Sequence, residues 1–197
     1  MCFLALLAGC GYHWQAPSLE GKPTLSIPLI TGDEEGCLTA ELIRAFHRSG
    51  LVAVCREGGD YRLHVSLLKQ DVTTIGFRRD IERISGKPKK YLIASEARKS
   101  LTLEVFFYEG TTDRIAFGPY LITSDADFDY IMGDSLEDLV FSTPSDPLVV
   151  VLPFSLGQLE PMESAQEAAN KPLYTHLSQK IVDAFFADCY DNTKYNK

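Results

Sequence analysis

The chain has 197 residues, enough for one domain, and its 45% hydrophobic and 23% charged residues are typical of a protein that folds around a core. A formal net charge of −8 makes it a poor general nucleic-acid binder, because binding to nucleic-acid phosphates depends on Lys and Arg. The apolar run at residues 2–8 is far shorter than the 20 or so apolar residues needed to span a bilayer, and no other run in the sequence is long and apolar enough.

The N-terminus carries the most specific motif, Leu7-Ala8-Gly9-Cys10. A short apolar run that ends in small residues before a cysteine is typical of a bacterial lipoprotein signal, although no Lys or Arg follows Met1. In such a signal the Cys10 thiol receives a diacylglyceryl group, the preceding residues are removed, and further acyl chains such as palmitate make the anchor firm. We predict a signal peptide over residues 1–9, truncated at its start, and a lipidated linker over 10–23. The alternative is a buried N-terminal strand with a free cysteine.

The first half of the chain after this linker alternates in two distinct patterns. Residues 24–30 alternate between apolar and polar side chains, which predicts a strand that ends near Pro28. Residues 38–49 place apolar side chains on one helical face, and Gly50 is well suited to end that helix. Residues 61–72 begin with a clean apolar–polar alternation, which predicts a half-buried strand.

The second half continues with strands and ends in a helix. Residues 91–97 extend a neighbouring strand, while 101–107 and 114–124 alternate again on either side of a Gly-containing loop, which predicts an antiparallel hairpin. In 125–161, the least regular stretch, the run 148–152 is apolar enough for a short strand. The final helix is predicted over 172–187, and Ser164 with Glu167 fits a capping box of a preceding helical piece.

These elements indicate one fold class. Each helix has a single apolar stripe and each strand a single apolar face, so both helices can cover the same side of one sheet. We predict an α+β two-layer sandwich, with two helices packed on one face of a mixed, mostly antiparallel sheet of about four strands. This single domain spans residues 24–189, and a flexible tail follows over 190–197.

The charge is unevenly distributed along this domain. Residues 78–99 contain eight basic and three acidic side chains, although the whole chain is acidic. A basic patch on an acidic protein can attract an anionic partner, and Arg binds phosphate bidentately. The alternative is a solvated loop whose lysines keep it soluble. The candidate phosphate-binding residues are Arg78, Arg79, Arg83, Lys87, Lys89 and Lys90.

Motifs for catalysis or metal binding are weak. The four histidines are scattered, and the common nucleophile, zinc-protease and phosphate-loop motifs do not occur. Asp125-x-Asp127-x-Asp129 resembles a calcium loop, but Tyr130 occupies the position that requires Gly. We therefore interpret the three aspartates as lying on the solvent-exposed face at the end of a strand. We expect no metal and no cofactor. Once Cys2 is removed and Cys10 acylated, three cysteines remain, which allow at most one disulfide: Cys37, Cys55 and Cys189.

Three stretches together resemble the LPS-assembly lipoprotein (LptE-like) family. The first is the run 7–14, LAGCGYHW, where the family has a lipidated Cys followed by Gly, an aromatic residue and His. The second combines the predicted strand 24–30, the helix 38–49 and the strand that starts with DYRLHV. The third is the C-terminal helix over 173–186.

The resemblance implies a protein that is not an enzyme and is lipid-anchored by Cys10 on the periplasmic side of the outer membrane. It implies that the chain plugs and helps to assemble the LPS-translocon β-barrel protein, assists LPS insertion and binds LPS. Because LPS carries phosphates, the resemblance also favours LPS contacts at the six basic residues named above. Two other roles stay open: a lipoprotein adaptor or pilot of another envelope complex, such as a secretion or pilus machine, and a lipid-anchored hydrolase.

Overall fold

The computed structural model describes residues 21–79, 87–131, 140–141, 143–145, 149–150 and 161–195. The predicted signal peptide, Cys10 and most of the linker therefore lie outside the described residues. In chain order the elements are β1 (Thr24–Ser26), α1 (Cys37–Ser49), β2 (Ala53–Cys55), β3 (Tyr61–Arg78), β4 (Ile93–Glu109), β5 (Ile115–Asp129), the two-residue strands β6 (Val140–Phe141) and β7 (Val149–Val150), α2 (Met162–Ala168) and α3 (Asn170–Tyr195).

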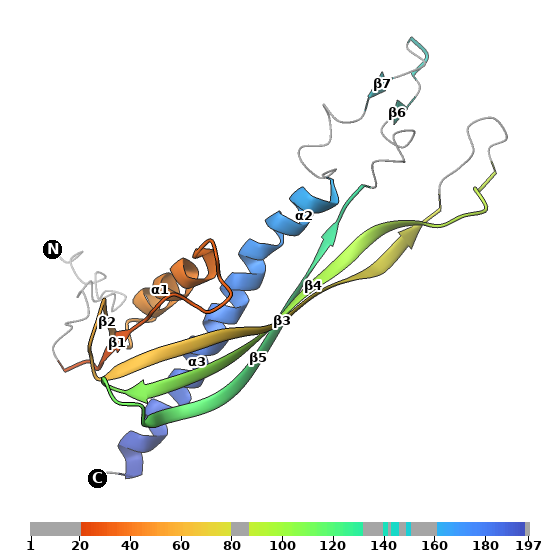
Figure 1. Ribbon diagram of the computed structural model, residues 1–197. Coiled ribbons are helices and arrows are strands. Elements are labelled where there is room, and N and C mark those ends of the chain that lie inside the picture. The colour runs from red at the N-terminus through yellow and green to blue at the C-terminus, as the bar shows by residue number, and fades with distance from the viewer. Residues whose placement is uncertain are drawn as a thin grey trace, which may run out of the picture.

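The main sheet has the strand order β2-β1-β3-β4-β5. β1 pairs in parallel with β2 and β3, while β3, β4 and β5 are antiparallel neighbours. Helices α1 and α3 lie on the same side of this sheet (Figure 1). The predicted α+β two-layer sandwich is therefore confirmed, with five strands in place of about four. The fifth is the three-residue edge strand β2, which the chain reaches from β1 by a crossover through α1.

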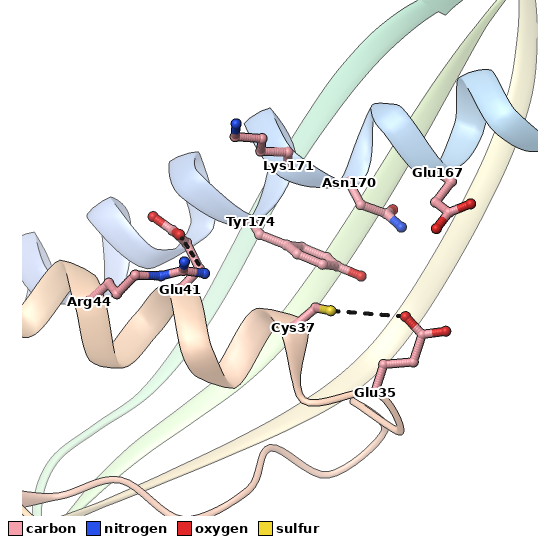
Figure 2. A pocket seen from close by; sticks show the side chains of 8 residues that line it. All are labelled: Glu35, Cys37, Glu41, Arg44, Glu167, Asn170, Lys171 and Tyr174. Carbon is pink, nitrogen blue, oxygen red and sulfur yellow. Dashed lines mark hydrogen bonds and ion pairs between the residues drawn. The ribbon is translucent and has the colours of Figure 1, made fainter. Parts of the chain in front are cut away.

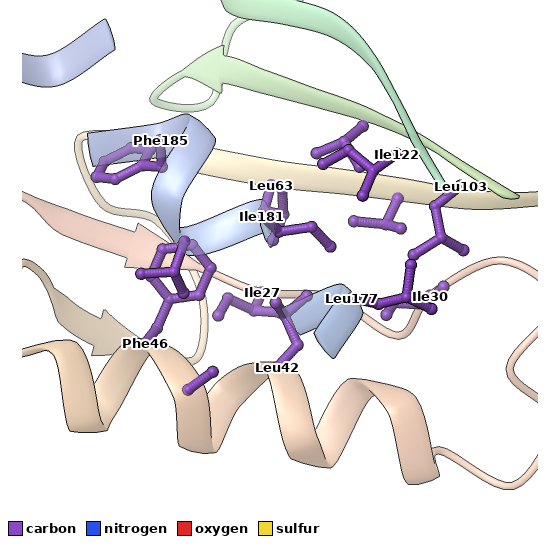
Figure 3. Packing of buried hydrophobic residues seen from close by; sticks show 14 of the residues in the cluster. Ile27, Ile30, Leu42, Phe46, Leu63, Leu103, Ile122, Leu177, Ile181 and Phe185 are labelled. Atoms are coloured by element: carbon purple, nitrogen blue, oxygen red, sulfur yellow. The ribbon is translucent and has the colours of Figure 1, made fainter. Parts of the chain in front are cut away.

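The core lies between the sheet and these two helices. Leu42 and Phe46 of α1 are fully buried, as are Leu103 and Phe107 of β4. Figure 3 shows how side chains from both layers meet in one apolar cluster. The apolar stripe of α3 completes it with Leu173, Leu177, Ile181, Val182 and Phe185.

The ends of α1 show why it forms where it does. The residue before it, Gly36, has no side chain to cap the first turn. Instead the Asp33 carboxylate accepts the backbone N–H of Thr39 at 2.7 Å and that of Leu38 at 3.4 Å. At the other end Gly50 has φ of 63°, a left-handed conformation that glycine adopts without strain. The predicted stop at Gly50 is confirmed.

Two of the predicted strand segments are parts of much longer strands. β3 has 18 residues and β4 has 17, so the predicted segment 91–97, from Ile93 on, and the segment 101–107 belong to the single strand β4. Register shifts between Leu67 and Lys69 and between Thr74 and Gly76 interrupt the alternation without ending the pairing. Sequence periodicity resets at such bulges, whereas the backbone ladder continues as long as a partner strand is present.

The C-terminal helix is also longer than its apolar stripe. α3 begins at Asn170 and continues to Tyr195, because no Gly or Pro interrupts it after Pro172. The short helix α2 precedes it, as the helical piece before the final helix was expected to do. The predicted capping box is wrong: the N-cap of α2 is Pro161, and Ser164 lies inside the helix.

One charged residue faces the core. Lys99 of β4 is 5% exposed, and its position follows the inward alternation of Leu101 and Leu103. It separates the main apolar cluster, which includes Leu101, from a smaller one that contains Ala97. Burial lowers the pKa of the Lys99 ammonium. Within the described residues, no hydrogen bond or ion pair compensates its charge.

Replacing Lys99 with Met is expected to raise the free energy of unfolding by about 1–3 kcal/mol, because the position lies among apolar side chains that partly desolvate the charged ammonium. The folded-state pKa of Lys99 is below its ordinary 10.5, so the unfolded chain binds more protons between the two values. The free-energy cost of burying the charged Lys99 ammonium is complete below the folded-state pKa and shrinks as the pH rises toward 10.5. Urea unfolding at pH 7 and pH 10 should therefore show a smaller difference between the two proteins at pH 10. An equal difference in unfolding free energy between the two proteins at pH 7 and pH 10 would contradict this prediction.

Candidate functional site

The strongest candidate site is the far end of the β3–β4 hairpin. β5 pairs with β4 as far as the pair Glu96–Asp129, and β3 and β4 continue together to the pair Arg78–Ile93. The Ser95 carbonyl still accepts the Tyr130 N–H at 3.0 Å, and beyond Ser95 the sheet is a two-stranded ribbon, which projects away from α1 and α3 (Figure 1). An isolated two-stranded ribbon has little stability of its own, so this end of the sheet is stabilised mainly by its continuity with the three-stranded part.

The structure brings most of the predicted phosphate-binding residues to this end. Arg78 is the last residue of β3 and Arg79 follows it, while Lys87, Lys89 and Lys90 precede β4. Antiparallel pairing therefore places the two groups on neighbouring chain segments, although about ten residues separate them in sequence. Arg83 lies outside the described residues.

The remaining basic residues of the 78–99 stretch do not belong to this surface. Arg98 lies further along β4, where its guanidinium binds the Asp127 carboxylate with two hydrogen bonds of 2.6 and 2.8 Å. This hydrogen bond and the charge of Arg98 lower the pKa of Asp127. Lys99 points into the core, as described above. The stretch is one basic block in sequence but three different environments in the fold, because alternate residues of a strand face opposite sides.

Apolar side chains accompany the basic residues at the end of the hairpin, and sequence analysis did not single them out. Phe77, Tyr91 and Leu92 are 59%, 57% and 57% exposed, and Ile75 is 39% exposed. The Lys89 ammonium lies 5.6 Å from the centre of the Tyr91 ring, a cation–π contact. The signal that could have revealed them is the apolar YLI run directly after the lysines. We call Ile75, Phe77–Arg79 and Lys87–Leu92 the hairpin tip.

A second feature is the sheet face that points away from the helices. Its aromatic side chains pack on one another: the ring centres of Phe106 and Tyr108 are 6.1 Å apart, and His64 lies 6.4 Å from Phe106. The Arg62 guanidinium lies 5.1 Å from the centre of the Tyr108 ring. Leu121, on the same face of β5, is 70% exposed. This face is an apolar and aromatic surface that also carries charged side chains, among them Arg62 and Glu104.

The three aspartates of the calcium-like motif lie on β5. They are alternate residues of the strand, Asp125, Asp127 and Asp129, and all three are exposed. This agrees with their interpretation as the solvent-exposed face at the end of a strand. Asp127 pairs with Arg98, and Asp125 lies 3.6 Å from the same guanidinium. Among the residues that the structure describes, no group of three or more His, Cys, Asp or Glu side chains could hold a metal ion.

A groove of about 340 Å³ lies between α1 and the junction of α2 with α3 (Figure 2). Its charges partly compensate one another, since Glu41 and Arg44 form an ion pair of 3.1 Å. The Cys37 thiol donates a long 3.9 Å hydrogen bond to the Glu35 carboxylate. The described lining holds no histidine beside this thiol. The lining residues are Glu35, Cys37, Glu41, Arg44, Glu167, Asn170, Lys171 and Tyr174.

The three cysteines that could form a disulfide are free thiols. Cys37 is exposed, whereas Cys55 and Cys189 are half-buried. Burial, with a smaller contribution from Asp188, raises the pKa of the Cys189 thiol to about 11. A thiol with that pKa stays protonated at neutral pH and is a poor nucleophile.

None of the described helices contains an apolar stretch of the length that a bilayer crossing requires.

Comparison with known proteins gives similarity of structure only. No protein-family model matches the sequence, and no curated protein matches it. The crystal structure of a minor lipoprotein from Acinetobacter baumannii is similar with a TM-score of 0.45 and 12% identity, over 84% of this chain and 93% of that one. The rare lipoprotein B from Shewanella oneidensis is similar with a TM-score of 0.44 and 14% identity, over 87% of this chain and 98% of that one. At these values the likeness is one of broad arrangement, so the function is argued from the residues of this chain.

Proposed function

We propose that this chain is an outer-membrane lipoprotein, anchored through Cys10 on the periplasmic side, that plugs and helps to assemble the LPS-translocon β-barrel. In this role it assists LPS insertion and contacts LPS phosphates with the basic residues of the hairpin. It acts by binding, not by catalysis. The sequence support is the lipobox with its Gly-Tyr-His continuation and the order of elements that follows it.

The observation that carries the proposal is the position of the basic residues relative to β1. β1, the first described strand, pairs with β3 at Tyr61 and Arg62, and the basic residues begin sixteen residues later at Arg78. At about 3.3 Å per residue, the strand covers on the order of 50 Å between these points. The hydrocarbon core of a bilayer is about 30 Å thick. A domain tethered near β1 and inserted into a barrel with β3 along the membrane normal would therefore be long enough to carry its basic residues across the membrane.

The test is an affinity pull-down of the full-length lipoprotein from detergent-solubilised outer membranes, with mass spectrometry of the co-eluting proteins. We expect the LPS-translocon barrel in stoichiometric amount. A Cys10→Ser form, which cannot receive the diacylglyceryl group, should leave the membrane fraction and serves as the control for anchoring. Recovery of a secretion or pilus complex in place of the barrel would contradict the plug function and favour an adaptor function.

A further inference from the structure

The hairpin tip combines a basic charge with exposed apolar side chains, and contact with phosphates explains only the charge. Residues 77–95 contain six basic and two acidic side chains, a net charge of +4 in a chain of −8. Phosphate binding accounts for the charge, but it gives no reason for Phe77, Tyr91 and Leu92 to be more than half exposed. The packing of the residues that the structure describes gives none either, because the tip lies beyond the last pair of β4 with β5.

The backbone positions of these apolar residues lie close together. Phe77 pairs with Ala94, and Arg78 pairs with Ile93, so Leu92 and Tyr91 follow within two residues of the last strand pair. Neighbouring strands are about 4.8 Å apart and successive residues about 3.3 Å, which places all three positions at the same end of the ribbon. The ribbon behind them is only two strands wide, so burying these side chains within the domain would require a covering element.

We propose that the hairpin tip inserts into a packed anionic lipid surface, with its basic side chains at the lipid phosphates and Phe77, Tyr91 and Leu92 among the upper acyl carbons. Lys and Arg keep their charged ends in the headgroup layer while their apolar stems lie along neighbouring apolar groups. Aromatic rings with a polar end favour the same interfacial layer, and Lys89 already lies against the Tyr91 ring. Charge complementarity selects an anionic surface over a zwitterionic one. The inference deepens the proposed function, because it rests on the same basic residues.

The experiment measures binding of the full chain to vesicles of phosphatidylglycerol and phosphatidylethanolamine. All forms carry Cys10→Ser, so that no acyl chain of the protein contributes. The test variant is Phe77→Ser with Leu92→Ser, which keeps every charge. The matched control is Ile115→Ser with Leu121→Ser, which removes two apolar side chains of similar exposure, 46% and 70%, from the helix-free face of the sheet. All four positions are exposed, so neither variant should change the melting temperature by more than a few degrees.

We expect the tip variant to bind these vesicles about 10–100-fold more weakly and the control variant to bind them unchanged. Vesicles of phosphatidylcholine alone should bind poorly, since each basic residue near an anionic surface contributes roughly a fivefold gain in affinity. Equal binding by the tip variant and the control would overturn the insertion. Binding that 10 mM inorganic phosphate removes completely would show a phosphate site without lipid insertion, and would overturn it too.

Fluorescence supplies a second measurement that does not depend on affinity. The chain has a single tryptophan, Trp14, so a form with Trp14→Phe and Tyr91→Trp reports from the tip alone. Its emission should shift to the blue with anionic vesicles, and acyl-chain quenchers should reduce it. An emission that stays unchanged while the protein is bound would overturn the inference.

The insertion and the plug function can fail separately. If insertion fails but the barrel still co-purifies, only this inference is contradicted. If the barrel is absent but insertion is observed, only the plug function falls.

Discussion

Replacing Phe185 with Ala is expected to lower the free energy of unfolding by about 3–5 kcal/mol, the range found for large aromatic side chains removed from a core. Phe185 is 1% exposed and is the centre of the aromatic cluster. Its ring centre lies 4.9 Å from that of Phe107, 5.8 Å from Phe46, 5.9 Å from Phe117 and 5.7 Å from Tyr61. It thus connects α3 with α1 and with three strands, and the cavity left by alanine would border all of them.

Urea unfolding followed by far-ultraviolet circular dichroism measures this loss. The melting temperature should fall by roughly 10 °C, given about 2–4 °C per kcal/mol for a chain of this size. The control is Phe186→Ala on the neighbouring residue of the same helix, whose side chain is 48% exposed and which should cost about 1 kcal/mol or less. Similar losses for the two variants would show that the α3–sheet contact is not the main source of stability.

Neutralising the six basic residues Arg78, Arg79, Arg83, Lys87, Lys89 and Lys90 to Gln is expected to weaken LPS binding by at least about 100-fold. Lys and Arg near an anionic lipid surface contribute roughly 1 kcal/mol each, and the six do not add fully because they share the same phosphates. The fold should persist, because the tip lies beyond the helix-covered core. Binding can be measured with immobilised LPS at low and high salt, and the salt dependence should decrease in the variant.

The matched control removes the same number of charges elsewhere. Arg44, Arg48, Arg56, Arg114, Lys171 and Lys180 are all exposed and lie away from the hairpin tip. Their replacement by Gln changes the net charge equally and should leave LPS binding within about threefold, because these residues lie away from the tip. The fold should persist as well, since the ion pairs of Arg44 and Arg48 with Glu41 are surface pairs of small energy. Equal weakening by both variants would mean that net charge alone, not the tip, governs the binding. Unchanged binding in the tip variant would remove the assignment of these residues.

The helical core positions follow from sequence periodicity alone. A helix repeats every 3.6 residues, so Leu38, Leu42 and Phe46 had to share one face, and they are buried in the structure. The inward side of β4 was equally predictable where Leu101, Leu103 and Phe107 alternate. These assignments succeed because the chain itself fixes which side chains share a face.

The site was only partly predictable, for three physical reasons. Strand length depends on whether a partner strand continues, so the sequence did not show that β3 and β4 extend as a ribbon past β5. Bulges reverse which side chains face inward, so the exposure of Phe77 was not readable from its run. Composition assigned Lys99 to the basic stretch, but its place in the alternation buries it.

What the sequence by itself determined is the order of elements, the α+β class and the block of basic residues, because each is a pattern within short segments; the lipoprotein signal that ends at Cys10 stays a prediction. What only the tertiary structure decided is which of those basic residues lie together. Antiparallel pairing up to Arg78–Ile93 leaves Arg78 and Arg79 and the segment Lys87–Lys90 at the same end of the ribbon, and the alternation of β4 directs Arg98 to Asp127 and Lys99 to the core. The physical reason is that a charge block is a property of the chain, whereas a charged surface requires the pairing of two strands.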